Sequence, residues 1–209
     1  ACTKAPGGSG AYTMCFHGLG HGVFAAQGYD LEKTALFCEK TGTPQYHDRE
    51  YEECFGGAVM ELMGGGGHDR ETWLIARKRY LSPDNPLAPC ANAVVPAELK
   101  DICYMYLSPH LFEAAGADLA RPLPSHFATA FTYCDQISAS EPSQRNACFG
   151  GIGKEFPALA LERDIRAIEK ATPVILETLW SWCALAPHDE GRDACAEHVL
   201  NSLFWGGEN

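Results

Sequence analysis

Apolar residues recur at helical spacing along most of the chain, and no stretch shows the strict alternation of apolar and polar residues that is typical of a β-strand. In the segment from Leu31 to Cys38, for example, Ala35 and Leu36 fall on the same helical face as the two end residues. The pattern predicts an all-α protein. The expected helices span residues 15–27, 31–38, 54–63, 70–80, 97–115, 125–134, 148–156, 162–171, 173–183 and 193–205.

Several of these helices are preceded by residues that favour a helix N-terminus. Serine, threonine and aspartate side chains accept hydrogen bonds from the free backbone N–H groups of the first turn. The predicted N-cap residues are Asp30, Asp69, Ser125 and Thr172. Pro173 follows Thr172 at the first helical position, where the missing N–H of proline costs nothing.

Eight of the ten cysteines end or open a helical segment: Cys38, Cys134 and Cys183 end one, and Cys15, Cys54, Cys103, Cys148 and Cys195 open one. A polar loop separates each ending from the next opening, so we expect neighbouring cysteines to pair, although other connectivities stay open. Each pair would close a short loop and stabilise the fold by about 3 kcal/mol. The expected disulfides are Cys2–Cys15, Cys38–Cys54, Cys90–Cys103, Cys134–Cys148 and Cys183–Cys195.

The opening cysteines 15, 54, 103, 148 and 195 recur every 39 to 49 residues, a period that indicates helical hairpins in an array. The predicted architecture is one domain, residues 1–209, built as a helical-hairpin (αα) repeat array. It would form a short solenoid of about five disulfide-stapled units.

The first unit carries a family resemblance. The residues Gly18-Leu19, Val23-Phe24 and the run Gly28-Tyr29-Asp30-Leu31-Glu32-Lys33-Thr34-Ala35-Leu36-Phe37-Cys38 resemble a Sel1-like repeat, clearly over residues 15–38. The resemblance implies a secreted helical solenoid with a concave binding face, in which disulfides staple adjacent repeats. It implies no catalytic residues.

Composition and charge restrict the compartment and the partners. The net charge of −11 and the pI near 5.1 argue against nucleic acids and anionic membranes as partners. Ten cysteines without a C-x-x-C motif favour disulfides in the periplasm or outside the cell. The absence of C-x-x-C-H excludes covalent haem c. We expect no transmembrane segment, because no run of about 18 apolar residues occurs, and a signal peptide that has already been removed.

His17 and His21 are the strongest candidates for chemistry. Residues four apart lie on one face of a helix, and this spacing lets two imidazoles bind one transition-metal ion. The neighbouring Gly18, Gly20 and Gly22 each weaken the helix by about 1 kcal/mol relative to alanine. They therefore require a reason, which is the close approach of either a ligand or another helix.

Alignment of the units on their opening cysteines adds further candidate ligands. Glu61, His110 and Glu155 lie seven positions after their cysteines, and equivalent positions of a solenoid line one surface. Together with His17 and His21 they predict a site for Zn, Fe or Cu. The remaining candidates have structural interpretations: His47, His68 and His188 as surface residues, and Met60, Met63 and Met105 as core residues.

Two functions are consistent with these patterns. The first is a secreted or periplasmic protein that binds a transition metal or a small ligand through the histidine pair. The second is a protein-interaction scaffold, an accessory subunit of an extracytoplasmic complex without metal. Non-covalent haem held by two histidines is a third interpretation. No nucleophile elbow, P-loop or EF-hand loop is present, so the sequence points to no particular reaction.

Overall fold

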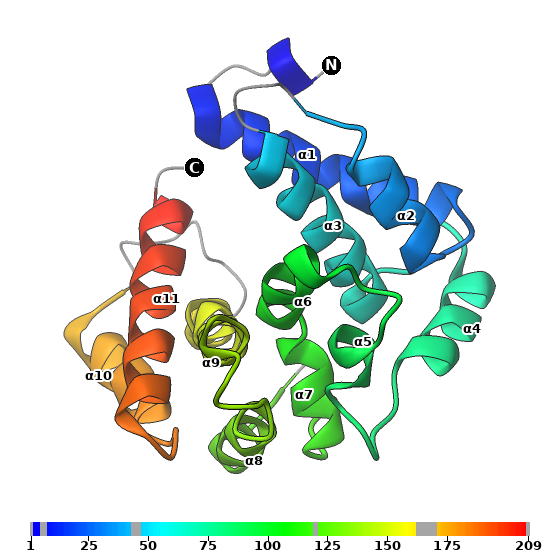
Figure 1. The fold of residues 1–209 in the computed structure, drawn as a ribbon. Coiled ribbons are helices and arrows are strands. Elements are labelled where there is room, and N and C mark those ends of the chain that lie inside the picture. Colours follow the sequence, from blue (N-terminus) through cyan, green and yellow to red (C-terminus); the bar gives the residue numbers. More distant parts are fainter. Residues whose placement is uncertain (1, 5–7, 43–46, 119–120, 162–170, 208–209) are drawn as a thin grey trace. The chain divides into compact units, whose positions relative to one another are not determined.

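The computed structural model describes residues 2–4, 8–42, 47–118, 121–161 and 171–207, and every regular element in these ranges is helical (Figure 1). The all-α prediction is therefore confirmed. The contacts divide the chain into two compact units, residues 1–107 and residues 108–209. The single domain and the repeat array stay predictions. None of the described helices is long and apolar enough to span a bilayer.

The first unit contains six α-helices and two short 3₁₀ helices among its described residues. They are, in chain order, the 3₁₀ helix Cys2–Lys4, α1 (Gly8–Ala26), α2 (Leu31–Cys38), α3 (His47–Gly64), α4 (Arg70–Tyr80), α5 (Ala88–Ala91), the 3₁₀ helix Ala97–Leu99 and α6 (Lys100–Tyr106). The second unit has five described helices. These are α7 (Ser108–Ala114), α8 (Pro124–Cys134), α9 (Pro142–Ala160), α10 (Pro173–Cys183) and α11 (Asp189–Gly207).

Three of the four predicted N-caps are confirmed. The side chains of Asp30 and Asp69 each accept the backbone N–H three residues later at 3.0 Å, and Thr172 does the same at 3.4 Å. The prediction for Ser125 is wrong, because α8 begins one residue earlier, at Pro124. Proline is favoured at the first helical position, which moves the cap position back to the residue before it.

The opening cysteines lie inside helices rather than at their starts. The helices α1, α3 and α9 begin six or seven residues before Cys15, Cys54 and Cys148. Cysteine has no capping preference. The actual starts carry the usual signals, namely Asp48 and Glu50 in the first turn of α3 and Pro142 at the start of α9.

The helix predicted over residues 97–115 is interrupted. A 3₁₀ turn leads into α6, which ends at Tyr106, and α7 starts at Ser108. Pro109 explains the break, because it has no N–H to donate and disfavours helical geometry in the residue before it. The helix predicted over 162–171 lies outside the described residues, apart from Ala171.

All five predicted disulfides are confirmed. The paired Cα atoms are between 5.4 and 5.6 Å apart, and no cysteine is free. Every bond closes a local loop, and each lies within a single unit. The disulfides therefore link segments of the same unit that are close in sequence.

In the first unit, α1 and α3 pack at backbone contact distance (Figure 1). A Cβ atom on Gly20 would lie 1.8 Å from the carbonyl oxygen of Cys54, and one on Gly57 would lie 2.0 Å from that of His17. Gly18 and Gly22 have open space where a Cβ would be. The expected close helix approach thus accounts for Gly20 but not for its two neighbours.

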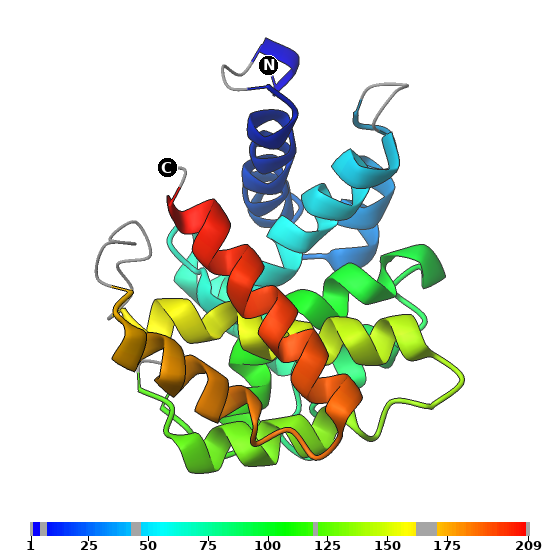
Figure 2. The same ribbon diagram turned by 90° about the vertical axis from the view of Figure 1, so that its left-hand side faces the viewer.

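In the second unit, α11 crosses α9 in a similar manner, and α10 lies beside both (Figure 2). A Cβ atom on Gly153 would lie 2.3 Å from the carbonyl oxygen of Cys195. Gly153 follows Cys148 by five residues, as Gly20 follows Cys15. The core beneath contains the aromatic rings of Phe127 and Phe156, whose centroids are 4.7 Å apart.

Candidate functional site

His17 and His21 lie on the face of α1 that meets α3. Their ring centroids are 5.2 Å apart, with an angle of 65° between the planes. The side chain of His17 is 8% exposed and that of His21 is 28% exposed. The two imidazoles therefore form a close pair, of which one member is buried and the other reaches solvent.

Each imidazole is paired with its own carboxylate from α3. His17 Nδ1 lies 3.1 Å from Glu53 Oε2, and His21 Nδ1 lies 3.0 Å from Glu61 Oε2. A carboxylate accepts hydrogen bonds, so it draws the imidazole proton to Nδ1 and leaves a lone pair on Nε2. Histidines that bind metals are oriented in the same way, by donating their other ring N–H to a carboxylate.

The glycine-rich segment after α3 holds Glu61 in place. The N–H of Gly66 donates to Glu61 Oε1 at 2.9 Å, and the indole N–H of Trp73 donates to the Glu61 carbonyl oxygen at 2.8 Å. A Cβ atom on Gly65 would lie 2.1 Å from the carboxyl carbon of Glu61. Gly65 thus makes room for this buried carboxylate, whereas Gly64 and Gly67 have nothing within 4 Å of an added Cβ.

Two further side chains complete the cluster around His17. The Tyr106 hydroxyl donates to Glu53 Oε2 at 3.3 Å, and its ring centroid lies 5.0 Å from that of His17. Met60 Sδ lies 3.4 Å from His17 Nε2. Met60 is 44% exposed, so its assignment to the core is wrong, whereas Met63 is buried as predicted.

The predicted ligand set is divided between the two units. His17, His21 and Glu61 come together in the first unit, with Glu61 bonded to Nδ1 of His21. His110 and Glu155 belong to the second unit. The convergence of all five on one groove stays a prediction. Among the described residues, no three His, Cys, Asp or Glu side chains are grouped so that they could hold a metal ion.

His110 and Glu155 have local surroundings of their own. His110 is only 3% exposed, and its Nδ1 lies 3.5 Å from Glu113 Oε2. Glu155 pairs with Lys154. His68 and His188 are exposed as expected. The His47 side chain lies outside the described part of the chain.

Sequence reasoning missed Glu53 and Tyr106, for two different reasons. Glu53 immediately precedes an opening cysteine, whereas the repeat alignment searched the positions after it. Tyr106 lies on another helix, α6, and nothing in the sequence indicates that α6 packs against α3. The helical spacing of Glu53 and Met60, which are seven residues apart, is the signal that would have placed both on one face of α3.

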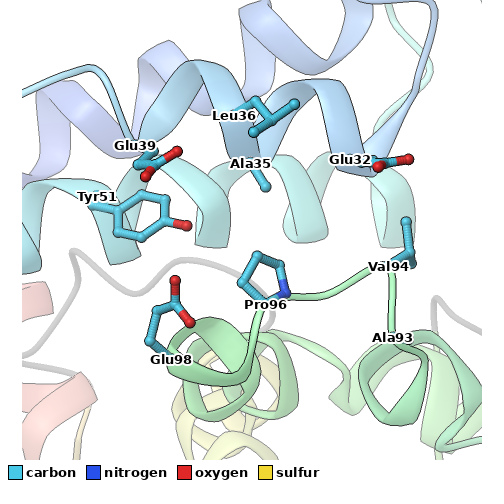
Figure 3. A pocket seen from close by; sticks show the side chains of 9 residues that line it. All are labelled: Glu32, Ala35, Leu36, Glu39, Tyr51, Ala93, Val94, Pro96 and Glu98. Atoms are coloured by element: carbon cyan, nitrogen blue, oxygen red, sulfur yellow. The ribbon is translucent and has the colours of Figure 1, made fainter.

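A second feature of the first unit is an acidic pocket of about 230 Å³ between α2, α3 and the segment before α6 (Figure 3). Its apolar wall includes Leu36 and Pro96. The Tyr51 hydroxyl donates to Glu98 and lies near Glu39. Burial and these two carboxylates raise the pKa of Tyr51 to about 12. A tyrosine that stays neutral and a surplus of negative charge favour a cationic group in this pocket.

Comparisons with known proteins assign no relative to this chain. No protein-family model, curated protein or solved structure matches it. The resemblance to Sel1-like repeats over residues 15–38 is thus still an expectation.

Proposed function

We propose that this protein binds a transition-metal ion through Nε2 of His17 and Nε2 of His21. The observation that carries the proposal is the pairing of both Nδ1 atoms with separate carboxylates, those of Glu53 and Glu61. This pairing selects the tautomer in which each Nε2 has a free lone pair. Metal-binding histidines commonly have such a carboxylate partner on the nitrogen that does not contact the metal.

The separation of the two rings supports a shared ion. Two imidazoles that bind one tetrahedral ion with metal–nitrogen distances of about 2.0–2.1 Å have centroids roughly 5 Å apart. The observed centroid distance is 5.2 Å. The exposure of His21 leaves a path from solvent for the ion. Glu61 then orients His21, a different role from that of the ligand expected from the sequence.

The setting of the site is part of the proposal. Five disulfides favour an oxidising compartment, the periplasm or the extracellular space. A Sel1-like repeat organisation is supported by the matching close contacts of Gly20 with Cys54 and of Gly153 with Cys195. In such an array, α1 and α3 are equivalent to α9 and α11.

Metal analysis tests this function. Protein purified without chelators is analysed for bound metals by mass spectrometry, and its metal-free form is titrated with Zn²⁺, Cu²⁺ and Cu⁺. We expect near-stoichiometric binding that is lost in His17→Ala/His21→Ala. The matched control His68→Ala/His188→Ala removes two exposed histidines and should bind as the wild type does. A wild type that binds none of Zn²⁺, Cu²⁺ and Cu⁺ contradicts the proposal.

A protein-interaction scaffold is the second candidate, and the acidic pocket favours it. Glu32, Glu39 and Glu98 surround an apolar wall, an arrangement that suits a lysine or arginine side chain of a partner. In this case the carboxylates of Glu53 and Glu61 stabilise the packing of α1 on α3 through the histidines. Metal-free wild type would favour this second function.

A further inference from the structure

The ring of His17 contacts a thioether sulfur, that of Met60, through Nε2. The two atoms are 3.4 Å apart. A thioether sulfur carries no hydrogen and acts only as a weak acceptor. In the neutral tautomer with its proton on Nδ1, directed at Glu53, His17 presents the Nε2 lone pair to the sulfur. A protonated imidazole would instead donate the Nε2–H to the sulfur.

A shared metal ion would turn this contact into an attraction. Nitrogen and sulfur ligands bind at about 2.0 Å and 2.3 Å, so at tetrahedral angles they are separated by about 3.5 Å. The observed 3.4 Å matches this separation. His21, whose ring centroid is 5.2 Å from that of His17, supplies a second nitrogen on the same side of α1.

The donor set indicates which metal is preferred. Thioether sulfur is a soft ligand that favours Cu⁺, whereas carboxylate and water oxygens suit harder ions. Both nearby carboxylates are engaged with Nδ1 atoms, and Glu61 is also bonded to Gly66. Two imidazole nitrogens and one thioether therefore remain for the ion.

The position of Met60 fits a role as a ligand. A methionine on a helix that buries most of its apolar residues would be expected in the core, yet Met60 is 44% exposed. Met63, on the same helix, is 1% exposed. The Met60 side chain thus extends from the buried ring of His17 to solvent.

We propose that His17, His21 and Met60 supply three ligands of a tetrahedral Cu⁺ site, with Glu53 and Glu61 fixing the two imidazoles. The inference rests on the metal site proposed above, and it identifies the preferred ion and a third ligand. Since soft ligands are preferred by Cu⁺, the site should favour Cu⁺ over Zn²⁺.

The test is a competition titration of the full chain with Cu⁺. The metal-free protein competes with a chromophoric Cu⁺ chelator in the presence of ascorbate and without oxygen, and Zn²⁺ affinity is measured in parallel. Met60→Leu keeps an apolar side chain but removes the sulfur. Met14→Leu is the matched control, because Met14 is 58% exposed and lies on α1.

We expect Met60→Leu to weaken Cu⁺ binding more than about 10-fold. Losing a group that only orients a metal ligand already costs about that much. Its Zn²⁺ affinity should change far less, and Met14→Leu should match the wild type. Copper K-edge spectra should show a sulfur neighbour at about 2.3 Å in the wild type but not in Met60→Leu. Circular dichroism verifies that both variants are folded.

The outcomes separate this inference from the proposed function. If Met60→Leu binds Cu⁺ as tightly as the wild type, or if the spectra show no sulfur, the three-ligand site is wrong. The histidine pair then stands as a metal site, provided that His17→Ala/His21→Ala abolishes binding. If the wild type binds none of Zn²⁺, Cu²⁺ and Cu⁺, both proposals fail.

Discussion

At the scale of single residues, the site depends on groups that set the orientation of other groups. Glu61 is 6% exposed, and its carboxylate contacts both the Gly66 N–H and His21. Glu53 has the same relation to His17, with Tyr106 as its second partner. Each histidine thus pairs with a carboxylate that has a second hydrogen-bond partner. Small changes around the carboxylates should therefore alter metal affinity.

Gly65→Ala tests this dependence. The added Cβ would meet the carboxylate of Glu61 at 2.1–2.3 Å, and the flexible side chain can move away without unfolding the helix. We expect metal affinity to fall about 10–100-fold, the usual effect of losing a group that orients a metal ligand. The unfolding free energy should change little. Gly67→Ala is the control, because its Cβ would have nothing within 4 Å. Equal affinities in the two variants would contradict the role of Glu61.

His198 is expected to make the second unit sensitive to acid. Its ring packs on Gly150, and burial lowers its pKa, as does Lys154, against the opposing effect of Glu197. Below the normal histidine pKa of about 6.5 the unfolded chain therefore binds more protons than the folded one, so stability falls as pH decreases. Between pH 7.5 and pH 5.5, the free energy of unfolding measured in urea should fall less for His198→Asn than for the wild type. His68 is exposed, so His68→Asn should behave as the wild type does. An equal decrease in unfolding free energy for His198→Asn and the wild type would refute the prediction.

At the scale of elements, sequence signals located most helices but placed several starts wrongly. Capping residues worked because the interaction is local: Asp30 and Asp69 bond the backbone three residues away. The opening cysteines misled because they bond a neighbouring helix from within their own helix rather than from its start. Cys54, for example, is fully buried within α3. Such a position depends on tertiary packing, which the local pattern does not encode.

The packing of α1 on α3 can be tested at Gly20. Its Cβ would collide with backbone, which cannot give way, so Gly20→Ala should destabilise the protein near the upper end of the roughly 1–3 kcal/mol typical of overpacking. Gly22→Ala has open space and should instead stabilise α1 by up to about 1 kcal/mol through helix propensity. Denaturant unfolding measures both. Equal effects of the two substitutions would show that α1 does not approach α3 this closely.

At the scale of the whole molecule, the disulfides were predictable from the sequence, and the contacts between helices distant in sequence were not. Each bond joins cysteines 12 to 16 residues apart, so the pairing depends on local order along the chain. The histidine pair was predictable for the same reason, because four residues of helix fix it. Glu53 and Met60 entered the site through contacts between helices distant in sequence. Helical periodicity specifies which face is apolar but not which partner covers it.

The local pairing leads to a prediction for residues 1–107. This unit contains three complete disulfides, the histidine pair and the acidic pocket, and no disulfide joins it to residues 108–209. We therefore expect the fragment, secreted alone into an oxidising compartment, to fold. Peptide mapping without reduction should recover the pairs Cys2–Cys15, Cys38–Cys54 and Cys90–Cys103.

Tyr51 provides the readout of native structure in this fragment. Its pKa of about 12 requires burial beside Glu98 and Glu39, whereas an unfolded tyrosine titrates near 10. Since the unfolded chain releases this proton first, the stability from Tyr51 falls as the pH rises from about 10 towards 12. The ultraviolet titration of the fragment minus that of its Tyr51→Phe variant should show one group near 12. A transition near 10, or scrambled cysteines, would mean that the first unit needs the rest of the chain to fold.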